Sequence, residues 1–178
     1  MHRYVALLGS INVGGNRLKM AELAAALKRN GFVNVDTVVA SGNVLFDHEG
    51  AADATLGEAM SKIVKEEFGF DTFAAVRTKA ELQSALDESP FAGVGEDRFV
   101  HVHFLTDQPD PSQFEKLGTD YEGRGLEKIA PGTRALHIDY VSGVGASKLT
   151  GPFIERRLGC KGTARNILSL KRIIEKVD

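Results

Sequence analysis

The stretch YVALLGSINVGGNRLKMAELAAALKRNG, residues 4–31, decides how the first half of the chain folds. Residues 4–11 are apolar and rich in strand formers, and residues 12–16 (NVGGN) are turn formers. From residue 20 onward, apolar side chains recur at helical spacing, and Gly31 is a natural helix stop. The stretch therefore predicts a buried strand, a turn, and a helix over residues 20–30.

The residues that follow complete a recognisable order of elements. Strands at residues 35–40 and 44–46 flank the turn Ser41-Gly42-Asn43, which predicts a β-hairpin. Residues 54–68 then follow a helical period, and residues 72–77 form a further strand. The resulting order β-α-β-β-α-β is that of the ferredoxin-like split βαβ arrangement.

The second half predicts a less regular version of the same unit. We expect a helix over residues 80–89, a strand at 99–105, a hairpin within 125–141, and two final helices near 146–158 and 163–177. The predicted fold is therefore α+β with two ferredoxin-like (α/β plait) units. The expected domains are a βαββαβ unit over residues 1–78 and a degenerate α/β plait with C-terminal helices over residues 79–178.

Composition bounds the class of protein. The chain has 178 residues, of which 43% are hydrophobic and 26% charged, and these globular proportions exclude a disordered chain. Its single cysteine, Cys160, excludes an intrachain disulfide and fits a reducing compartment. Apolar runs stay well short of the roughly 18–20 residues of a membrane span, so we expect no membrane partner. The apolar run at residues 4–11 is followed by a polar motif and no cleavage site, so we expect no signal peptide and a cytoplasmic location.

Three segments give the sequence a family resemblance: LLGSINVGGNRLKMAEL (residues 7–23), SGNVLF (41–46) and GTARNILSLKRI (162–173). In this order and spacing they resemble a family of bacterial proteins filed as domain of unknown function 1697. The resemblance spans nearly the whole chain and implies two ferredoxin-like plaits. It implies no established activity, cofactor or catalytic residue. The sequence departs from the family at Gly9-Ser10, where an Arg-Gly pair is usual, and at Ile167, where an aromatic residue is usual.

The best candidate site comes from the geometry of a βαββαβ plait. The end of its first strand, the start of its first helix and its hairpin turn lie at one end of the sheet, so the turns at residues 12–16 and 41–43 should approach each other. Glycines allow close approach of backbone N–H groups, and the helix start adds partial positive charge beside Arg17 and Lys19. Such a place suits a small phosphate or carboxylate group. The alternative is that the two turns only brace each other.

A second candidate is the segment Thr163-Ala164-Arg165-Asn166. Thr163 reads as the N-cap of the last helix, which would put Arg165 in the first turn, where the helix dipole disfavours a cation. Arg165 would then need either an internal carboxylate partner or a bound anion. The complete candidate ligand site comprises Asn12, Gly14, Gly15, Asn16, Ser41, Gly42, Asn43, Arg165 and Asn166.

Other chemistry is favoured less. His101 and His103 share a strand face, as two ligands of a metal ion would. His137 and a carboxylate such as Asp139 would have to complete the site. We expect no metal ion here, and we expect no cofactor. The adjacent acids Asp87 and Glu88 read as solvated surface.

The charge distribution bears on partners. The formal net charge is −2, but the segment from Lys148 onward carries +5 and the residues before it −7. This basic segment meets either nucleic acid or the acidic body of its own fold. The function therefore stays unknown at this stage. The expected partner is a small anionic ligand, nucleic acid is a less favoured alternative, and a purely structural protein, including a homodimer, is the third.

Overall fold

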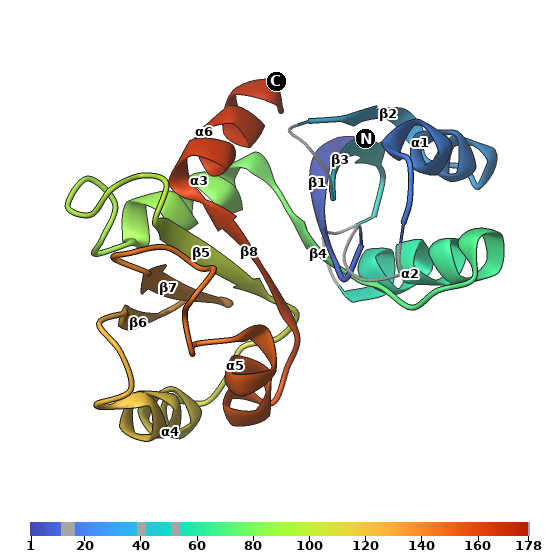
Figure 1. Ribbon diagram of the computed structural model, residues 1–178. Helices are drawn as coiled ribbons and strands as arrows, with labels where there is room; N and C mark the ends of the chain where they lie inside the picture. The colour runs from blue at the N-terminus through green and yellow to red at the C-terminus, as the bar shows by residue number, and fades with distance from the viewer. Residues whose placement is uncertain (12–16, 39–41, 51–53, 178) are drawn as a thin grey trace. The chain divides into compact units, whose positions relative to one another are not determined.

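We describe the fold from a computed structural model of the chain, in which residues 1–11, 17–38, 42–50 and 54–177 are described (Figure 1). The elements, in chain order, are β1 (His2–Gly9), α1 (Met20–Arg29), β2 (Val33–Thr37), β3 (Asn43–His48), α2 (Ala54–Phe68), β4 (Phe73–Arg77), α3 (Lys79–Glu88), β5 (Val100–Leu105), α4 (Pro111–Tyr121), β6 (Lys128–Gly132), β7 (Ala135–Asp139), α5 (Gly151–Leu158), β8 (Gly162–Asn166) and α6 (Ile167–Lys176).

The strands form two four-stranded antiparallel sheets. The first has the order β2-β3-β1-β4 and the second the order β6-β7-β5-β8. In each unit the first and last strands are therefore neighbours, β1 beside β4 and β5 beside β8, as the split βαβ arrangement requires. The predicted α+β class, with two ferredoxin-like units, is confirmed, and so is the βαββαβ order of the first unit.

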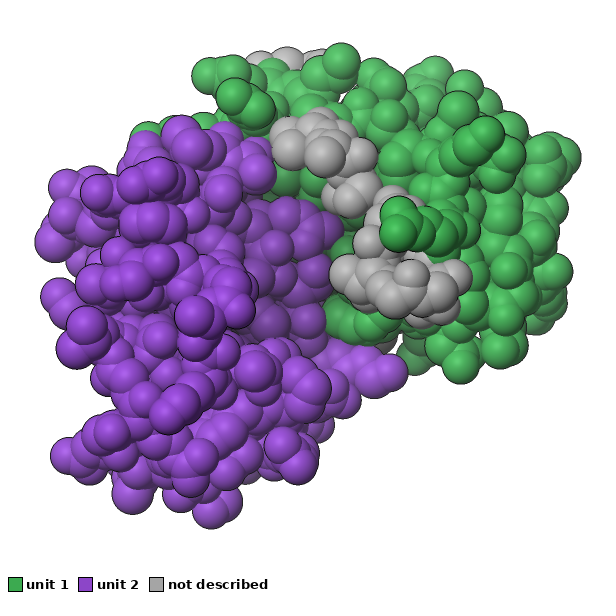
Figure 2. All heavy atoms as spheres, viewed as in Figure 1, with its two compact units in different colours: residues 1–82, 171–178 green, residues 83–170 purple. Residues whose placement is uncertain are grey.

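The chain divides into two compact units (Figure 2). The first comprises Met1–Leu82 together with Lys171–Asp178, and the second comprises Gln83–Leu170. The chain thus leaves the first unit within α3 and returns to it within α6. The predicted domain boundary between residues 78 and 79 stays a prediction.

One face of the first sheet carries a hydrophobic core. Side chains that alternate along β1, at Tyr4, Ala6 and Leu8, point to this face. Helices α1 and α2 cover it with residues such as Leu23 and Met60, which are fully buried. The strand alternation and the helical period of the sequence therefore converge on one apolar layer.

The second sheet is covered in the same way. Leu105, Leu136 and Ile138 lie on one face and pack with Leu117 of α4 and Ile154 of α5. Both helices lie on this side of the sheet in Figure 1. The second unit is therefore a complete βαββαβ plait, whereas the sequence predicts a degenerate one.

The difference arises at β8. The sequence predicts a helix over residues 163–177, but residues 162–166 form a strand that pairs antiparallel with β5. Gly162 permits this pairing, because an added Cβ there would collide with the ring of His103. The helix begins at Ile167, and the Asn166 carboxamide oxygen accepts a hydrogen bond from the Ser169 N–H at 2.8 Å. Asn166, not Thr163, therefore caps α6.

Helix α5 also begins later than the sequence predicts. The expected helix near residues 146–158 starts at Gly151, where the Thr150 hydroxyl accepts from the Phe153 N–H at 3.3 Å.

Among the described residues, no helix is long and apolar enough to cross a membrane.

Candidate functional site

At the end of the first sheet where the two turns are predicted to approach each other, the structure describes the strand ends that adjoin them. Leu7 at the end of β1 pairs with Asn43 at the start of β3. One residue further, the Leu8 N–H donates to the Gly42 carbonyl at 2.7 Å, and the Val38 N–H donates to the Asn43 carbonyl at 3.2 Å. The end of β1 and the start of β3 therefore lie side by side.

Gly42 and Asn43 each have a structural reason for their residue type. Gly42 has φ +78°, in the left-handed region that favours glycine. Asn43 is buried, with 1% of its surface exposed. A buried carboxamide must find hydrogen-bond partners inside the protein or on a ligand, and Asn43 does make further interactions within the chain.

The start of α1 contributes positive charge at this end of the sheet. Lys19 occupies the N-cap position and has an extended backbone, with φ −79° and ψ 129°. Its ammonium group offers only donors, and within the described residues its side chain makes no capping hydrogen bond to the first turn. Lys19 and Arg17 are both exposed. The helix therefore begins with two cations beside backbone N–H groups that can donate hydrogen bonds to an anion.

Five of the nine candidate residues lie outside the described part of the chain, namely Asn12, Gly14, Gly15, Asn16 and Ser41. Gly42 and Asn43 lie together at the strand end of the first unit. Arg165 and Asn166 belong to the second unit, in β8.

Arg165 lies in a strand and not in the first turn of a helix. It pairs with Val102 of β5, and its guanidinium donates to the Thr163 hydroxyl at 2.7 Å and the Ala164 carbonyl at 2.9 Å. Burial lowers the pKa of Arg165 to about 10, so the group stays charged at neutral pH. The unfavourable helix-dipole position predicted for it is therefore wrong, because the tertiary pairing of β8 replaces the helix.

The histidines divide between the two faces of the second sheet. His137 pairs with Val102, so its side chain lies on the face opposite to those of His101 and His103. These three residues therefore cannot surround one metal ion. Burial, followed by repulsion from His101 and Arg165, lowers the pKa of His103 to about 4, which keeps its imidazole neutral at physiological pH.

A polar cluster that the sequence does not predict surrounds Glu88 at the end of α3. The Glu88 carboxylate accepts from the Thr133 N–H at 3.0 and 3.1 Å and from the Thr133 hydroxyl at 2.9 Å. Its Oε2 also lies 3.0 Å from Nε2 of the fully buried His137. Asp87 and Glu88 are both exposed, as the sequence predicts, but the hydrogen bonds of Glu88 to Thr133 and His137 are not predicted by it.

The contact between Glu88 and His137 fixes the position of one hydrogen. Burial raises the pKa of Glu88, but hydrogen bonds from His137 and Thr133 outweigh it and hold that pKa below its ordinary value. A carboxylate only accepts, so Nε2 of His137 carries the hydrogen. Nδ1 of His137 is buried and has no hydrogen-bond partner among the described residues.

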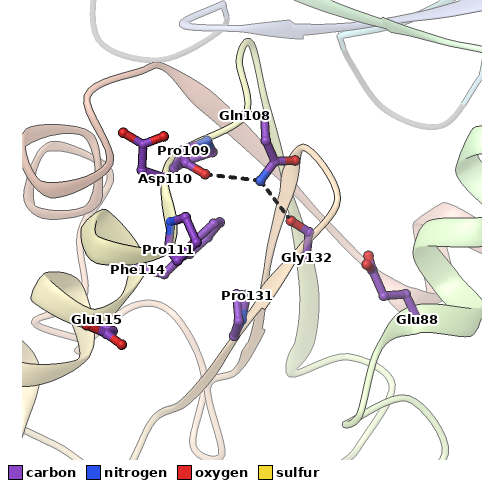
Figure 3. Close-up of a pocket in the computed structure, with 9 residues that line it drawn as sticks. All are labelled: Glu88, Gln108, Pro109, Asp110, Pro111, Phe114, Glu115, Pro131 and Gly132. Atoms are coloured by element: carbon purple, nitrogen blue, oxygen red, sulfur yellow. Dashed lines mark hydrogen bonds between the residues drawn. The ribbon is translucent and has the colours of Figure 1, made fainter.

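Beside this cluster, the second unit has a pocket of about 760 Å³ (Figure 3). Its walls come from the start of α4, the end of β6 and the end of α3. The lining residues are Glu88, Gln108, Pro109, Asp110, Pro111, Phe114, Glu115, Pro131 and Gly132.

Gly132 connects the pocket with the Glu88–His137 pair. A Cβ added at Gly132 would lie 2.7 Å from Nε2 of His137 and 2.9 Å from Oε2 of Glu88. We expect Gly132→Ala to push the two groups apart and to lower the free energy of unfolding by about 1–2 kcal/mol, measured by urea denaturation. Gly145→Ala is the matched control, because Gly145 has no positive φ and an added Cβ would meet no described atom within 4 Å. Gly123 does not serve, because its φ of +77° would strain any side chain. An equal loss in Gly145→Ala would contradict the expectation.

The basic C-terminal segment makes ion pairs within the protein. Arg157 Nε lies 3.1 Å from Asp120 Oδ2 in the second unit, and Lys176 Nζ lies 3.6 Å from Asp36 Oδ2 in the first. These contacts favour the interpretation in which the segment meets acidic groups of its own fold.

Two complete plaits in one chain define the class, a two-unit ferredoxin-like α/β protein. The chain belongs to the family described as "Protein of unknown function (DUF1697)", whose model matches residues 1–137. The fold is similar to that of a conserved bacterial protein, SP0830, from Streptococcus pneumoniae, with a TM-score of 0.71 and 22% sequence identity over 99% of this chain and 98% of that chain. A comparison with curated proteins finds no match.

Proposed function

We propose that the protein binds a small anionic ligand, bearing a phosphate or carboxylate group, at the end of the first sheet where the sequence predicts that residues 12–16 approach residues 41–43. The observation that carries this proposal is the pairing of Leu7 with Asn43, followed by the hydrogen bond between Leu8 and Gly42. This contact brings together the described flanks of two glycine- and asparagine-containing turns.

Electrostatics supports an anion over a neutral ligand. Arg17 and Lys19 are exposed and immediately precede α1, whose N-terminus carries partial positive charge. In a plait this N-terminus faces the same end of the sheet as the hairpin turn. A bound anion would accept from backbone N–H groups and neutralise both cations.

The proposal is tested by titrating the protein with inorganic phosphate and following backbone amide signals by NMR. We expect shifts at Leu8, Gly42 and Asn43, and an affinity weakened about twofold to fivefold by Lys19→Gln or Arg17→Gln. Lys28→Gln is the matched control, because Lys28 is an exposed lysine in the last turn of the same helix.

Two results would contradict this proposal. One is a titration in which phosphate leaves the amides of Gly42 and Asn43 unchanged. The other is an equal weakening by Lys28→Gln, which would show that only net charge matters. Chloride at matched ionic strength separates site binding from general screening.

We also propose that the protein works in the cytoplasm. The support is the single cysteine, Cys160, whose thiol lies 3.9 Å from the Asp107 carbonyl in the second unit. Burial raises the pKa of this thiol, which makes the reactive thiolate scarce. A chain without disulfides suits a reducing compartment.

A further inference from the structure

We propose that the pocket between α4, β6 and the end of α3 binds a small organic cation, an amine or guanidinium attached to an apolar or aromatic body. The pocket consists of residues of the second unit alone, and this inference does not depend on the proposed anion site.

The charge of the lining selects a cation. Three of the nine lining residues, Glu88, Asp110 and Glu115, are acids, and none of the described lining residues is lysine or arginine. Glu88 is held in place by Thr133 and His137, so its negative charge is fixed at the pocket wall. A preorganised charge attracts an opposite charge without the cost of ordering a side chain first.

The lining is also rich in acceptors and poor in donors. Three of its residues, Pro109, Pro111 and Pro131, have no backbone N–H. The carboxamide of Gln108 is a donor, and it already donates to the carbonyls of Pro109 at 3.3 Å and Gly132 at 3.4 Å, as the dashed lines in Figure 3 show. An ammonium or guanidinium group brings the donors that such a lining lacks.

The start of α4 does not reverse this preference. A helix N-terminus ordinarily favours an anion, but Pro111 at the first helical position contributes no N–H. The Asp110 N–H donates to the Gln113 carboxamide oxygen at 2.7 Å, and the Gln113 N–H donates to the Asp110 carbonyl at 2.9 Å. The acid at the N-cap further offsets the positive end of the helix.

Apolar rings provide the rest of the contact surface. Phe114 and Pro111 lie together at the start of α4, and Pro131 lies across from them on β6 (Figure 3). Phe114 is anchored by packing against the core of the second unit. A ligand with a ring or alkyl body would bury apolar surface here while its charge faces the carboxylates, and an aromatic ring also attracts cations.

The test uses benzylammonium as the probe and the full-length protein followed by amide NMR. We expect shifts centred on Gln108, Phe114 and Gly132, and an affinity at least about tenfold higher than for benzyl alcohol, which lacks the charge, or methylammonium, which lacks the ring. Benzoate, with the opposite charge, is expected to leave these signals unchanged.

Variants distinguish this pocket from general acidity. Glu115→Gln and Phe114→Leu are each expected to weaken benzylammonium binding about threefold to tenfold, and the effect of Glu115→Gln should fade at high salt. Glu122→Gln, an exposed acid just beyond α4, is the control and should change the affinity less than about twofold. Equal binding of benzyl alcohol or benzoate, or equal weakening by Glu122→Gln, would overturn the proposal.

Discussion

Replacing Glu88 with alanine is expected to lower the free energy of unfolding by about 2–4 kcal/mol. The carboxylate receives hydrogen bonds from two groups of Thr133 and from His137 Nε2. Its removal would leave the fully buried imidazole of His137 with neither nitrogen bonded to a described partner. Loss of a partner strands a buried donor, which costs more than the bond itself contributes.

Urea denaturation followed by circular dichroism measures this effect. Asp87→Ala is the matched control, since Asp87 is the adjacent exposed acid on α3 and accepts a local hydrogen bond from Gln83 Nε2 at 2.9 Å. Its substitution is expected to change stability by less than about 0.5 kcal/mol. Indistinguishable losses in the two variants would mean that the Glu88 cluster contributes nothing specific.

The Glu88 contribution should also depend on pH. The pKa of this carboxyl is lowered in the folded protein, so folding favours the ionised form. Its stabilisation is therefore present above the unfolded-state pKa and is lost as pH falls through the folded-state pKa. The stability difference between wild type and Glu88→Gln should be constant near neutral pH and shrink below about pH 4.5. A difference that grows on acidification would refute this assignment.

Replacing Gly57 with alanine is expected to have the second large effect on the free energy of unfolding. The change should be a loss, whereas alanine in place of glycine usually stabilises a helix. Inside an exposed helix, glycine to alanine usually gains about 1 kcal/mol. Gly57, however, is buried in α2, and an added Cβ would lie 2.6 Å from the backbone carbonyl oxygen of Ala74 in β4. Helix and strand would have to separate, so we expect a net loss of about 1–3 kcal/mol.

Gly118 in α4 provides the matched control for Gly57. It also lies inside a helix, but a Cβ there would meet no described atom within 4 Å. Gly118→Ala is therefore expected to raise the thermal midpoint, while Gly57→Ala lowers it by several degrees, roughly 4 °C per kcal/mol in a chain of this size. Thermal unfolding followed by circular dichroism measures both, and a gain in Gly57→Ala would show that α2 and β4 are not in close contact.

The first plait shows how far local pattern reaches. The apolar run in residues 4–11, the two strands of the predicted hairpin and the helical period of α2 each depend on neighbours in sequence, and β1, the β2–β3 pair and α2 are all present. The predicted juxtaposition of β1 and β3 followed from topology and is confirmed at Leu7 and Asn43. Whether the turns themselves bind a ligand stays a prediction.

The predictions that were wrong failed because contacts between distant parts of the chain overrode the local pattern. Thr163 reads as a good helix cap, but pairing with β5 makes residues 162–166 a strand, and the cap moves to Asn166. Glu88 and His137 are 49 residues apart in the chain, and their residue types carry no signal of the contact. The one local signal is Gly132 in a strand, since a glycine there can indicate a close approach by other groups, which here are His137 and Glu88.

The sequence by itself determined the class of fold and the element order of the first unit, because apolar periodicity directs burial residue by residue. Only the tertiary structure decided the state of β8, the separation of His137 from His101 and His103, and the Glu88–His137 contact. Each of these is set by strand register or by a long-range contact, and the free energy of such a contact exists only once distant segments have come together.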